Sequence, residues 1–407
     1  MEQEYEIAVE MKTGITAPKG FKAAGIHCGV KRFKKDLALI VSDVPAIAAG
    51  VFTQNKVQAA PVLLSKKHLY ENEKFRAIII NSGNANACTG ERGYNDAVMM
   101  AELTAKELNI RPEEVFVSST GVIGEPLPME KISSGIKKIV HHLSDDDNNS
   151  SAEAILTTDT FIKTASRSFE INDKTVTIGG IAKGSGMIHP NMATMLAFIT
   201  TDAAIEKNVF QNMLKNITDK TFNRIVVDGD TSTNDMVIAL ANGMSGINPI
   251  IADSEAYKIF YDNLYEVLKK LSIDIVKDGE GATKLVEINV EGAKNDEEAL
   301  KAAKTVALSP LVKTAVHGED ANWGRIIAAV GYSGVDFDPA KFEIIINDVP
   351  ILLQNYNVAL PAKEANKTLK PKEINLLLRL NIGSGKATCW TCDFSEEYVK
   401  INGSYRT

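Results

Sequence analysis

The sequence predicts a globular protein of the α/β class, and two observations carry that prediction. Its 407 residues are 44% hydrophobic and 24% charged, so at roughly 150 residues per domain the chain should hold two or three compact units around large buried cores. Short apolar runs with strand character also alternate with segments of helical periodicity along the whole chain. We find no internal repeat at periods of roughly 20 to 50 residues, which excludes solenoids and propellers.

The first half of the chain alternates strands and helices. We expect strands at 37–41, 76–80, 115–117, 168–171 and 175–181, and helices at 94–108, 129–142 and from 152. The polar run 144–150 is typical of an exposed loop. The turn residues Asn172-Asp173-Lys174 join two of the strands into a hairpin, and this hairpin leads the chain into the glycine-rich loop at 184–186.

The second half continues the same pattern. We expect strands at 194–201, 224–227, 285–290 and 342–346, and helices from 206 and at 233–241, 254–271, 296–304 and 323–330. Three final apolar runs, 376–381, 387–393 and 398–402, are interpreted as successive antiparallel strands.

Charge and cysteine content limit the classes of function. The net charge is −7, which is the wrong sign for a protein that binds nucleic-acid phosphates. The N-terminal residues Met1-Glu2-Gln3-Glu4 are acidic and lack the basic and apolar regions of a secretory signal. Four cysteines are too few for a disulfide framework. The sequence therefore predicts a cytoplasmic protein that binds neither nucleic acid nor a membrane.

No metal or cofactor site is predicted. The pair Cys389 and Cys392 has CxxC spacing but would need two more zinc ligands, and the six histidines show no metal-binding spacing. The acidic run 228–235 could hold a cation, but it lacks the spacing of an EF-hand. We favour an Asx-rich turn that caps a helix beginning near Thr233.

One segment has the composition expected of a self-cleaving nucleophile. The glycine-rich, proline-containing loop 183–193 runs directly into Thr194 and an apolar strand. A hydroxyl held in a tight loop can attack the carbonyl that precedes it, and Ala193 offers little steric obstruction. Hydrolysis of the resulting ester would give Thr194 a free α-amine, whose pKa of about 7.7 to 8.0 suits a general base. A plain loop entering a buried strand is the alternative that these residues leave open.

Six motifs, in order along nearly the whole chain, resemble one known family. They are Asn81 to Ala87, Ser119 to Gly124, Thr157 to Thr160, Lys183 to Leu196, Asp228 to Asp235 and Ile401 to Thr407. Together these segments resemble the bifunctional ornithine acetyltransferase and N-acetylglutamate synthase family of arginine biosynthesis.

The resemblance implies a fold, a cleavage site and a set of site residues. The fold would be a layered α/β sandwich with helices outside packed mixed or antiparallel sheets, in an enzyme with an N-terminal threonine nucleophile. Cleavage between Ala193 and Thr194 would divide the chain into an α chain, 1–193, and a β chain, 194–407, which stay associated, commonly as α2β2. Thr194 would accept the acetyl group, and Thr120 and Gly121 would form the oxyanion hole. The substrate-binding residues would be Thr157, Lys183, Thr194, Glu280, Asn402 and Thr407.

The resemblance also implies the reaction. Thr194 would take the acetyl group of N2-acetyl-L-ornithine and pass it to L-glutamate in a ping-pong cycle. We also expect synthesis of N-acetylglutamate from acetyl-CoA, used as a co-substrate with no bound cofactor. A self-processing aminopeptidase or amidase, in which water resolves the acyl-enzyme, is the alternative, and a non-catalytic amino-acid-binding protein is a third reading.

Overall fold

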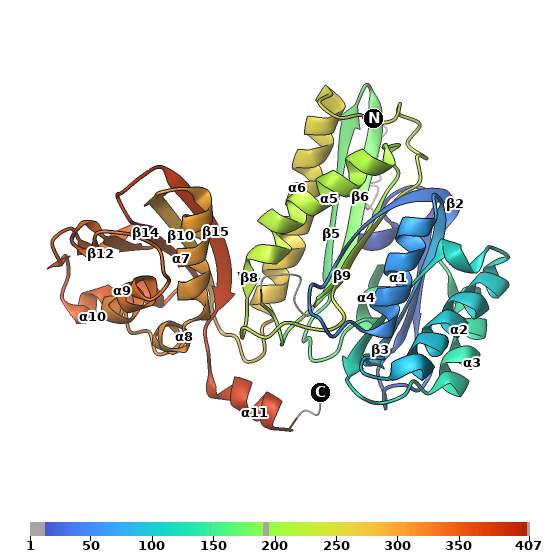
Figure 1. The fold of residues 1–407 in the computed structure, drawn as a ribbon, viewed down its shortest axis with the longest axis horizontal. Helices are drawn as coiled ribbons and strands as arrows, with labels where there is room; N and C mark the ends of the chain where they lie inside the picture. Colours follow the sequence, from blue (N-terminus) through green and yellow to red (C-terminus); the bar gives the residue numbers. More distant parts are fainter. Residues whose placement is uncertain (1–12, 147, 190–194, 405–407) are drawn as a thin grey trace, which may run out of the picture.

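The computed structural model describes residues 13–146, 148–189 and 195–404 of the chain. Figure 1 shows two sheet-containing units side by side. The larger unit comes from the part of the chain up to α6 (Glu255–Lys277), and the smaller one mainly from the part that follows. The last helix, α11 (Glu396–Ser404), runs back from the smaller unit toward the larger one.

The larger unit contains a long mixed sheet in which the two ends of the long strand β2 pair with different neighbouring strands. The strand order is β4-β3-β2-β9-β7-β6-β5, and β1 pairs with β2 beside this path. The strands are β1 (Phe21–Ile26), β2 (Leu37–Phe52), β3 (Phe75–Asn84), β4 (Val115–Val122), β5 (Lys163–Ile171), β6 (Lys174–Lys183), β7 (Leu196–Thr201) and β9 (Met236–Ala241). The first part of β2 pairs with β3 and the last part with β9, and its register with β3 shifts between Val41 and Ala46. This irregularity divides the sheet into two halves.

The two halves of this sheet pack face to face. Ile78 and Ile80 of β3 share one buried apolar cluster with Phe198 of β7 and Ile238 of β9. The alternate residues of the same strands, such as Ile79, belong to clusters on the opposite faces. Because successive side chains of a strand point to opposite faces, this division creates an inner layer between the halves and two outer surfaces.

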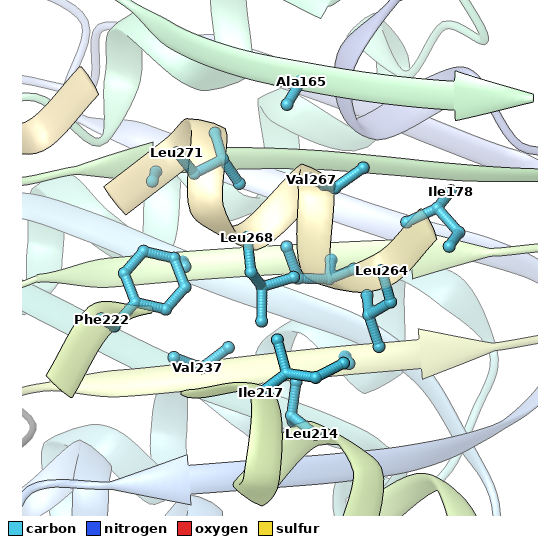
Figure 2. Close-up of a cluster of buried hydrophobic side chains, with 14 of the residues drawn as sticks. Ala165, Ile178, Leu214, Ile217, Phe222, Val237, Leu264, Val267, Leu268 and Leu271 are labelled. Carbon is cyan, nitrogen blue, oxygen red and sulfur yellow. The ribbon is translucent and has the colours of Figure 1, made fainter. Parts of the chain in front are cut away.

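Helices cover both outer surfaces of the larger unit. Those on the first half are α1 (Ala60–Glu71), α2 (Gly90–Leu108) and α3 (Met129–Ile139), and those on the second half are α5 (Lys207–Lys220) and α6. Figure 2 shows Leu264, Leu268 and Leu271 of α6 among strand side chains, at the i, i+4, i+7 spacing of a buried helix face. The short α4 (Asn148–Ala154) adds Ala152 and Ala154 to the inner layer. The helix-sheet-sheet-helix order confirms the predicted layered sandwich.

The smaller unit is a second mixed sheet with its own core. Its strand order is β13-β12-β11-β14-β10-β15-β8. The strands are β8 (Ile225–Val226), β10 (Leu285–Ala293), β11 (Glu343–Ile346), β12 (Val349–Leu353), β13 (Asn357–Val358), β14 (Glu373–Arg379) and β15 (Gly385–Cys392), and the helices are α7 (Asp296–Leu308), α8 (Pro310–His317), α9 (Trp323–Gly331) and α10 (Ala362–Ala365). Side chains of α7, α8 and α9 pack against this sheet. Trp390 and Cys392 join the cluster around α6 instead, which connects the two units.

The predicted hairpin is confirmed. Strands β5 and β6 are antiparallel, and they are joined by Asn172 and Asp173 with φ values of 49° and 59°. Two consecutive positive φ values are those of a type I′ turn, in which Asn and Asp are favoured.

Two predicted elements of the second half are wrong in type. Residues 233–241 were expected to form a helix, but Met236–Ala241 is the strand β9, buried along its whole length. A continuous apolar run carries no period that distinguishes a buried strand from a buried helix. The run 398–402 was expected to be a strand and lies in the helix α11. Strands β14 and β15 are also not neighbours, because β10 lies between them, parallel to β14 and antiparallel to β15.

The predicted cleavage site between Ala193 and Thr194 lies outside the described residues. Its neighbours in sequence lie in the large sheet, where β6 and β7 are antiparallel partners and Lys183 pairs with Leu196. Within the described part of the chain, no helix is both long and apolar enough to span a membrane.

Candidate active site

The predicted site residues that the structure describes line a single cavity of about 210 Å³. It lies where β4 and β6 end, next to the turns that precede β9 and follow α6, and α11 reaches its edge. The residues that line it include the predicted Thr120, Gly121, Thr157, Lys183, Glu280 and Asn402. Ala193, Thr194 and Thr407 lie outside the described residues, and the described chain resumes at the buried Met195.

Position 121, near the end of β4, requires glycine. Gly121 has a φ of 134°, and a Cβ added there would lie 2.3 Å from the carbonyl carbon of Gly83 on the neighbouring strand. Both the backbone angle and the close approach of β3 therefore exclude a side chain. A glycine N–H that lines a cavity can donate to a developing oxyanion, and each such donor is typically worth about 3 to 4 kcal/mol in the transition state.

Lys183 is a buried cation at the end of β6. Its side chain is almost completely enclosed, and Nζ lies 3.4 Å from Oγ1 of Thr120. Among the described residues, no carboxylate forms an ion pair with it at 4.0 Å or less. Burial lowers the pKa of the Lys183 ammonium, and the charge of Asp159 opposes that shift. A cation without a direct ion-pair partner suits an anionic group of a ligand.

Glu280 provides a carboxylate in the same cavity. It is buried in the turn after α6, and its Oε2 accepts a hydrogen bond of 2.7 Å from Nδ2 of Asn402 on α11. Its backbone N–H donates to the carbonyl of Ser185. A Cβ on Gly186 would lie 2.4 Å from the Glu280 carboxyl group, so glycine at 186 leaves room for this side chain.

Asp228 and Tyr398 also line the cavity, and neither was among the predicted site residues. Asp228 accepts hydrogen bonds from the backbone N–H groups of Met187 (2.6 Å) and Ile188 (2.8 Å). Burial raises the pKa of the Tyr398 hydroxyl, and the charge of Asp228 raises it further. Asp228 thus holds the loop that leads toward Thr194.

The predicted helix cap at 228–235 is instead a set of turns that supports the cavity. Nδ2 of Asn234 donates to the carbonyls of Ala85 (2.6 Å) and Ser119 (2.8 Å), so it connects two of the motifs. Oδ1 of Asp235 accepts from the Met195 N–H at 2.9 Å. Its Oδ2 is buried and has no hydrogen-bond partner in the described part of the chain. The abundance of Asp, Asn, Ser and Thr in 228–235 was the available signal, because such residues hydrogen-bond nearby backbone in turns.

Within residues 13–146, 148–189 and 195–404, no group of three or more His, Cys, Asp or Glu side chains could hold a metal ion. The two cysteines of the CxxC pattern both lie buried and unpaired on β15.

Comparisons with known proteins agree with the motifs. The ArgJ family model matches residues 22–407. The arginine biosynthesis bifunctional protein ArgJ of Symbiobacterium thermophilum is 52% identical over 397 residues, which cover 97% of this chain and 98% of that protein. The ArgJ protein of Thermotoga neapolitana is 51% identical over 395 residues, covering 96% and 99%. The crystal structure of the ArgJ protein of Bacillus halodurans is 43% identical with a TM-score of 0.50, covering 51% of this chain and 98% of that chain. Both the motifs and these matches lead to one conclusion: the chain belongs to the ArgJ family of bifunctional arginine biosynthesis proteins.

Proposed function

We propose that this chain transfers an acetyl group from N2-acetyl-L-ornithine to L-glutamate through an acetyl ester on Thr194. The observation that carries the proposal is that Lys183 and Glu280 line one cavity together with Thr120 and Gly121 of β4. A buried ammonium and a buried carboxylate in one cavity match the α-carboxylate and the ammonium group of an amino acid. Family membership supports the acetyltransferase and does not favour the aminopeptidase or amidase alternative.

The proposed cycle has two half-reactions. Thr194 Oγ attacks the acetyl carbonyl while the Thr194 α-amine takes the hydroxyl proton, and the oxyanion lies against Thr120 and Gly121. The C–N bond then breaks, the leaving ornithine amine takes the proton, and the acetyl group remains on Thr194. The α-amine of glutamate attacks this ester, which releases N-acetylglutamate and returns the proton to Thr194 Oγ.

The proposal includes cleavage between Ala193 and Thr194, because the general base is the amine that cleavage liberates. The solved Bacillus halodurans chain supports a cut, since nearly all of it is matched by about half of this chain. The α chain 1–193 and the β chain 194–407 would remain together, and we propose an α2β2 assembly. The word "bifunctional" in the names of the relatives supports a second activity, for which we propose acetyl-CoA as the donor.

The decisive variant is Thr194→Ala. Denaturing electrophoresis and N-terminal sequencing of wild-type protein should show a second chain that begins Thr-Met-Leu-Ala, whereas the variant should remain whole. Acetyl transfer to glutamate from N2-acetyl-ornithine, and from acetyl-CoA, should fall by at least ~1000-fold in the variant, as expected when a nucleophile is removed.

Two results would contradict the proposed function. Appreciable transfer by an uncleaved Thr194→Ala protein would exclude the proposed nucleophile. Acetate release from N2-acetyl-ornithine by the wild-type protein, at a rate that does not depend on glutamate, would assign it to the hydrolases instead.

A further inference from the structure

A second buried lysine, Lys163, lies beside the cavity without lining it. It is the first residue of β5 and is fully enclosed. Its Nζ lies 2.7 Å from Oδ1 of Asp159 and 2.5 Å from Oδ2 of Asp278, two carboxylates that are themselves buried. We call these three side chains the buried triad. Removing three charges from water carries a large desolvation cost, so the triad is not explained by stability alone.

The two carboxylates of the triad hold three segments that border the cavity. Asp159 accepts hydrogen bonds from the N–H groups of Gly184 (2.7 Å) and Thr157 (3.0 Å). Asp278 accepts from the N–H and Oγ1 of Thr160, and its backbone carbonyl accepts from Oγ of Ser185 at 2.6 Å. The turn at 157–160, the loop after Lys183 and the turn before Glu280 are therefore all attached to the same buried cation.

The triad also supplies two of the charges that act on Lys183, those of Asp159 and Lys163, beside the carboxylates of Asp235 and Glu280. Although burial raises the pKa of the Asp159 carboxyl, the positive charges of Lys183 and Lys163 together hold it far below its usual range. The charges of two lysines therefore act on Asp159, which is hydrogen-bonded directly to only one of them, Lys163. The partly buried Lys31 adds a weaker positive charge nearby, but its Nζ donates to the carbonyls of Lys35 and Leu156.

We propose that Lys163 is a positioning residue for acetyl transfer: by pairing with Asp159 and Asp278 it prevents Asp159 from capturing Lys183, whose Nζ stays available for the α-carboxylate of the substrate. This inference rests on the proposed function. Without Lys163, the buried carboxylates of Asp159 and Asp278 lose the ammonium group that pairs with both of them. Lys183 is then drawn toward Asp159, because an unpaired buried carboxylate is strongly unfavourable.

The test compares two acetyl donors that differ only in the α-carboxylate, N2-acetyl-ornithine and N-acetylputrescine. In Lys163→Met, kcat/KM for N2-acetyl-ornithine should fall by about 10- to 100-fold, the usual value of a hydrogen bond to a charged group, mostly through KM. The value for N-acetylputrescine should change by less than about threefold, because this donor has no carboxylate for Lys183 to bind. General damage to the fold would lower both values alike, and that result would overturn the proposal.

Two further variants test whether the effect depends on the positive charge of Lys163 and on the carboxylate of Asp159. Lys163→Gln keeps N–H donors but not the charge, so it should lose discrimination between the donors as Lys163→Met does. Lys163→Met combined with Asp159→Asn removes the competing carboxylate, while the Asn carbonyl can still accept from Gly184. This double variant should restore the ratio of the two kcat/KM values to within about threefold of wild type, and failure to restore it would exclude Asp159 as the competitor.

The matched control is Lys313→Met. Lys313 is also a fully enclosed lysine, but its Nζ donates to Oγ1 of Thr391 and to the carbonyl of Cys392, outside the cavity. This variant should be less stable than wild type, but the ratio of its kcat/KM values for the two donors should not change. If Lys313→Met folds and neither Lys163 single variant does, Lys163 serves the fold and the inference is wrong. If wild-type protein itself transfers no acetyl group from N2-acetyl-ornithine, the proposed function fails instead.

Discussion

At the scale of single residues, Asp235 is a buried carboxyl group that is hydrogen-bonded to the residue after the predicted nucleophile. Its Oδ1 accepts from the N–H of Met195, the residue after Thr194, and its Oδ2 has no partner among the described residues. Burial raises the pKa of Asp235 well above its usual range, and the hydrogen bond from Met195 only partly opposes that shift. Relative to the unfolded chain, the folded protein therefore favours the protonated form of this carboxyl group.

This shift predicts how stability depends on pH at Asp235. Below the unfolded pKa of about 3.9 the group is protonated in both states. As the pH rises toward the higher folded pKa, the unfolded state ionises first, so Asp235 progressively destabilises the fold. Asp235→Asn lacks this ionisation. The melting temperature of the variant minus that of wild type should therefore increase by about 2 °C or more from pH 4.5 to pH 7.5. A difference in melting temperature that is constant across this range would contradict the raised pKa.

At the scale of elements, α11 reaches the cavity through a few polar contacts. None of its described residues is buried. Asn402 donates to Glu280 from this helix, and Ser395, just before it, donates to the carbonyl of Gly281. Gly281 has a φ of 71°, and a Cβ there would lie 2.6 Å from the backbone nitrogen of Tyr398. The position of α11 therefore depends on the absence of a side chain at 281.

Gly281→Ala should displace α11 and raise KM for both amino acid substrates by about tenfold, since it disturbs the Asn402–Glu280 hydrogen bond. The left-handed backbone should also destabilise the protein by about 1 to 2 kcal/mol. The measurement is steady-state kinetics together with thermal unfolding. Gly403→Ala is the control, because it adds a methyl group to the same helix where nothing lies within 4 Å. Equal KM values for the two variants would show that contact at 281 does not position α11.

At the scale of the whole molecule, the proposed cut does not separate two units. Strands β7 and β9 follow residue 194, yet they lie between β2 and β6, which precede it. Six residue pairs join β6 to β7, and six join β2 to β9. The inner apolar layer likewise contains residues from both sides of the cut. The two products would share one sheet and one core.

Cleaved protein should therefore elute as one species in native size-exclusion chromatography and separate into two chains only in denaturant. In residues 194–407 expressed alone, β7 and β9 should not form a stable sheet, because they would lose both flanking strands and leave their edges unpaired. Amide-exchange protection of β7 and β9 in the isolated 194–407 fragment, or separation of the chains without denaturant, would contradict this prediction.

Much of the fold was accessible from local patterns, and each failure has its own physical cause. The Asn172-Asp173 turn and the helices α2 and α6 were predicted because turn chemistry and helical periodicity act over a few residues. The type of β9 was wrong because burial on both faces removes the alternation that identifies a strand. The helix α11 was missed because it has a weak apolar face and is held by contacts with distant segments.

The sequence by itself determined the family and the class of fold, and it predicted a set of site residues, because each motif is a short run of residues whose chemistry can be recognised locally. Only the tertiary structure showed that the six described site residues share a cavity and that Lys163 pairs with both Asp159 and Asp278. Lys163 and Asp278 are separated by 115 positions in sequence, and Asn402 and Glu280 by 122. Such pairs are brought together by packing of whole elements, so no local pattern in the chain encodes them.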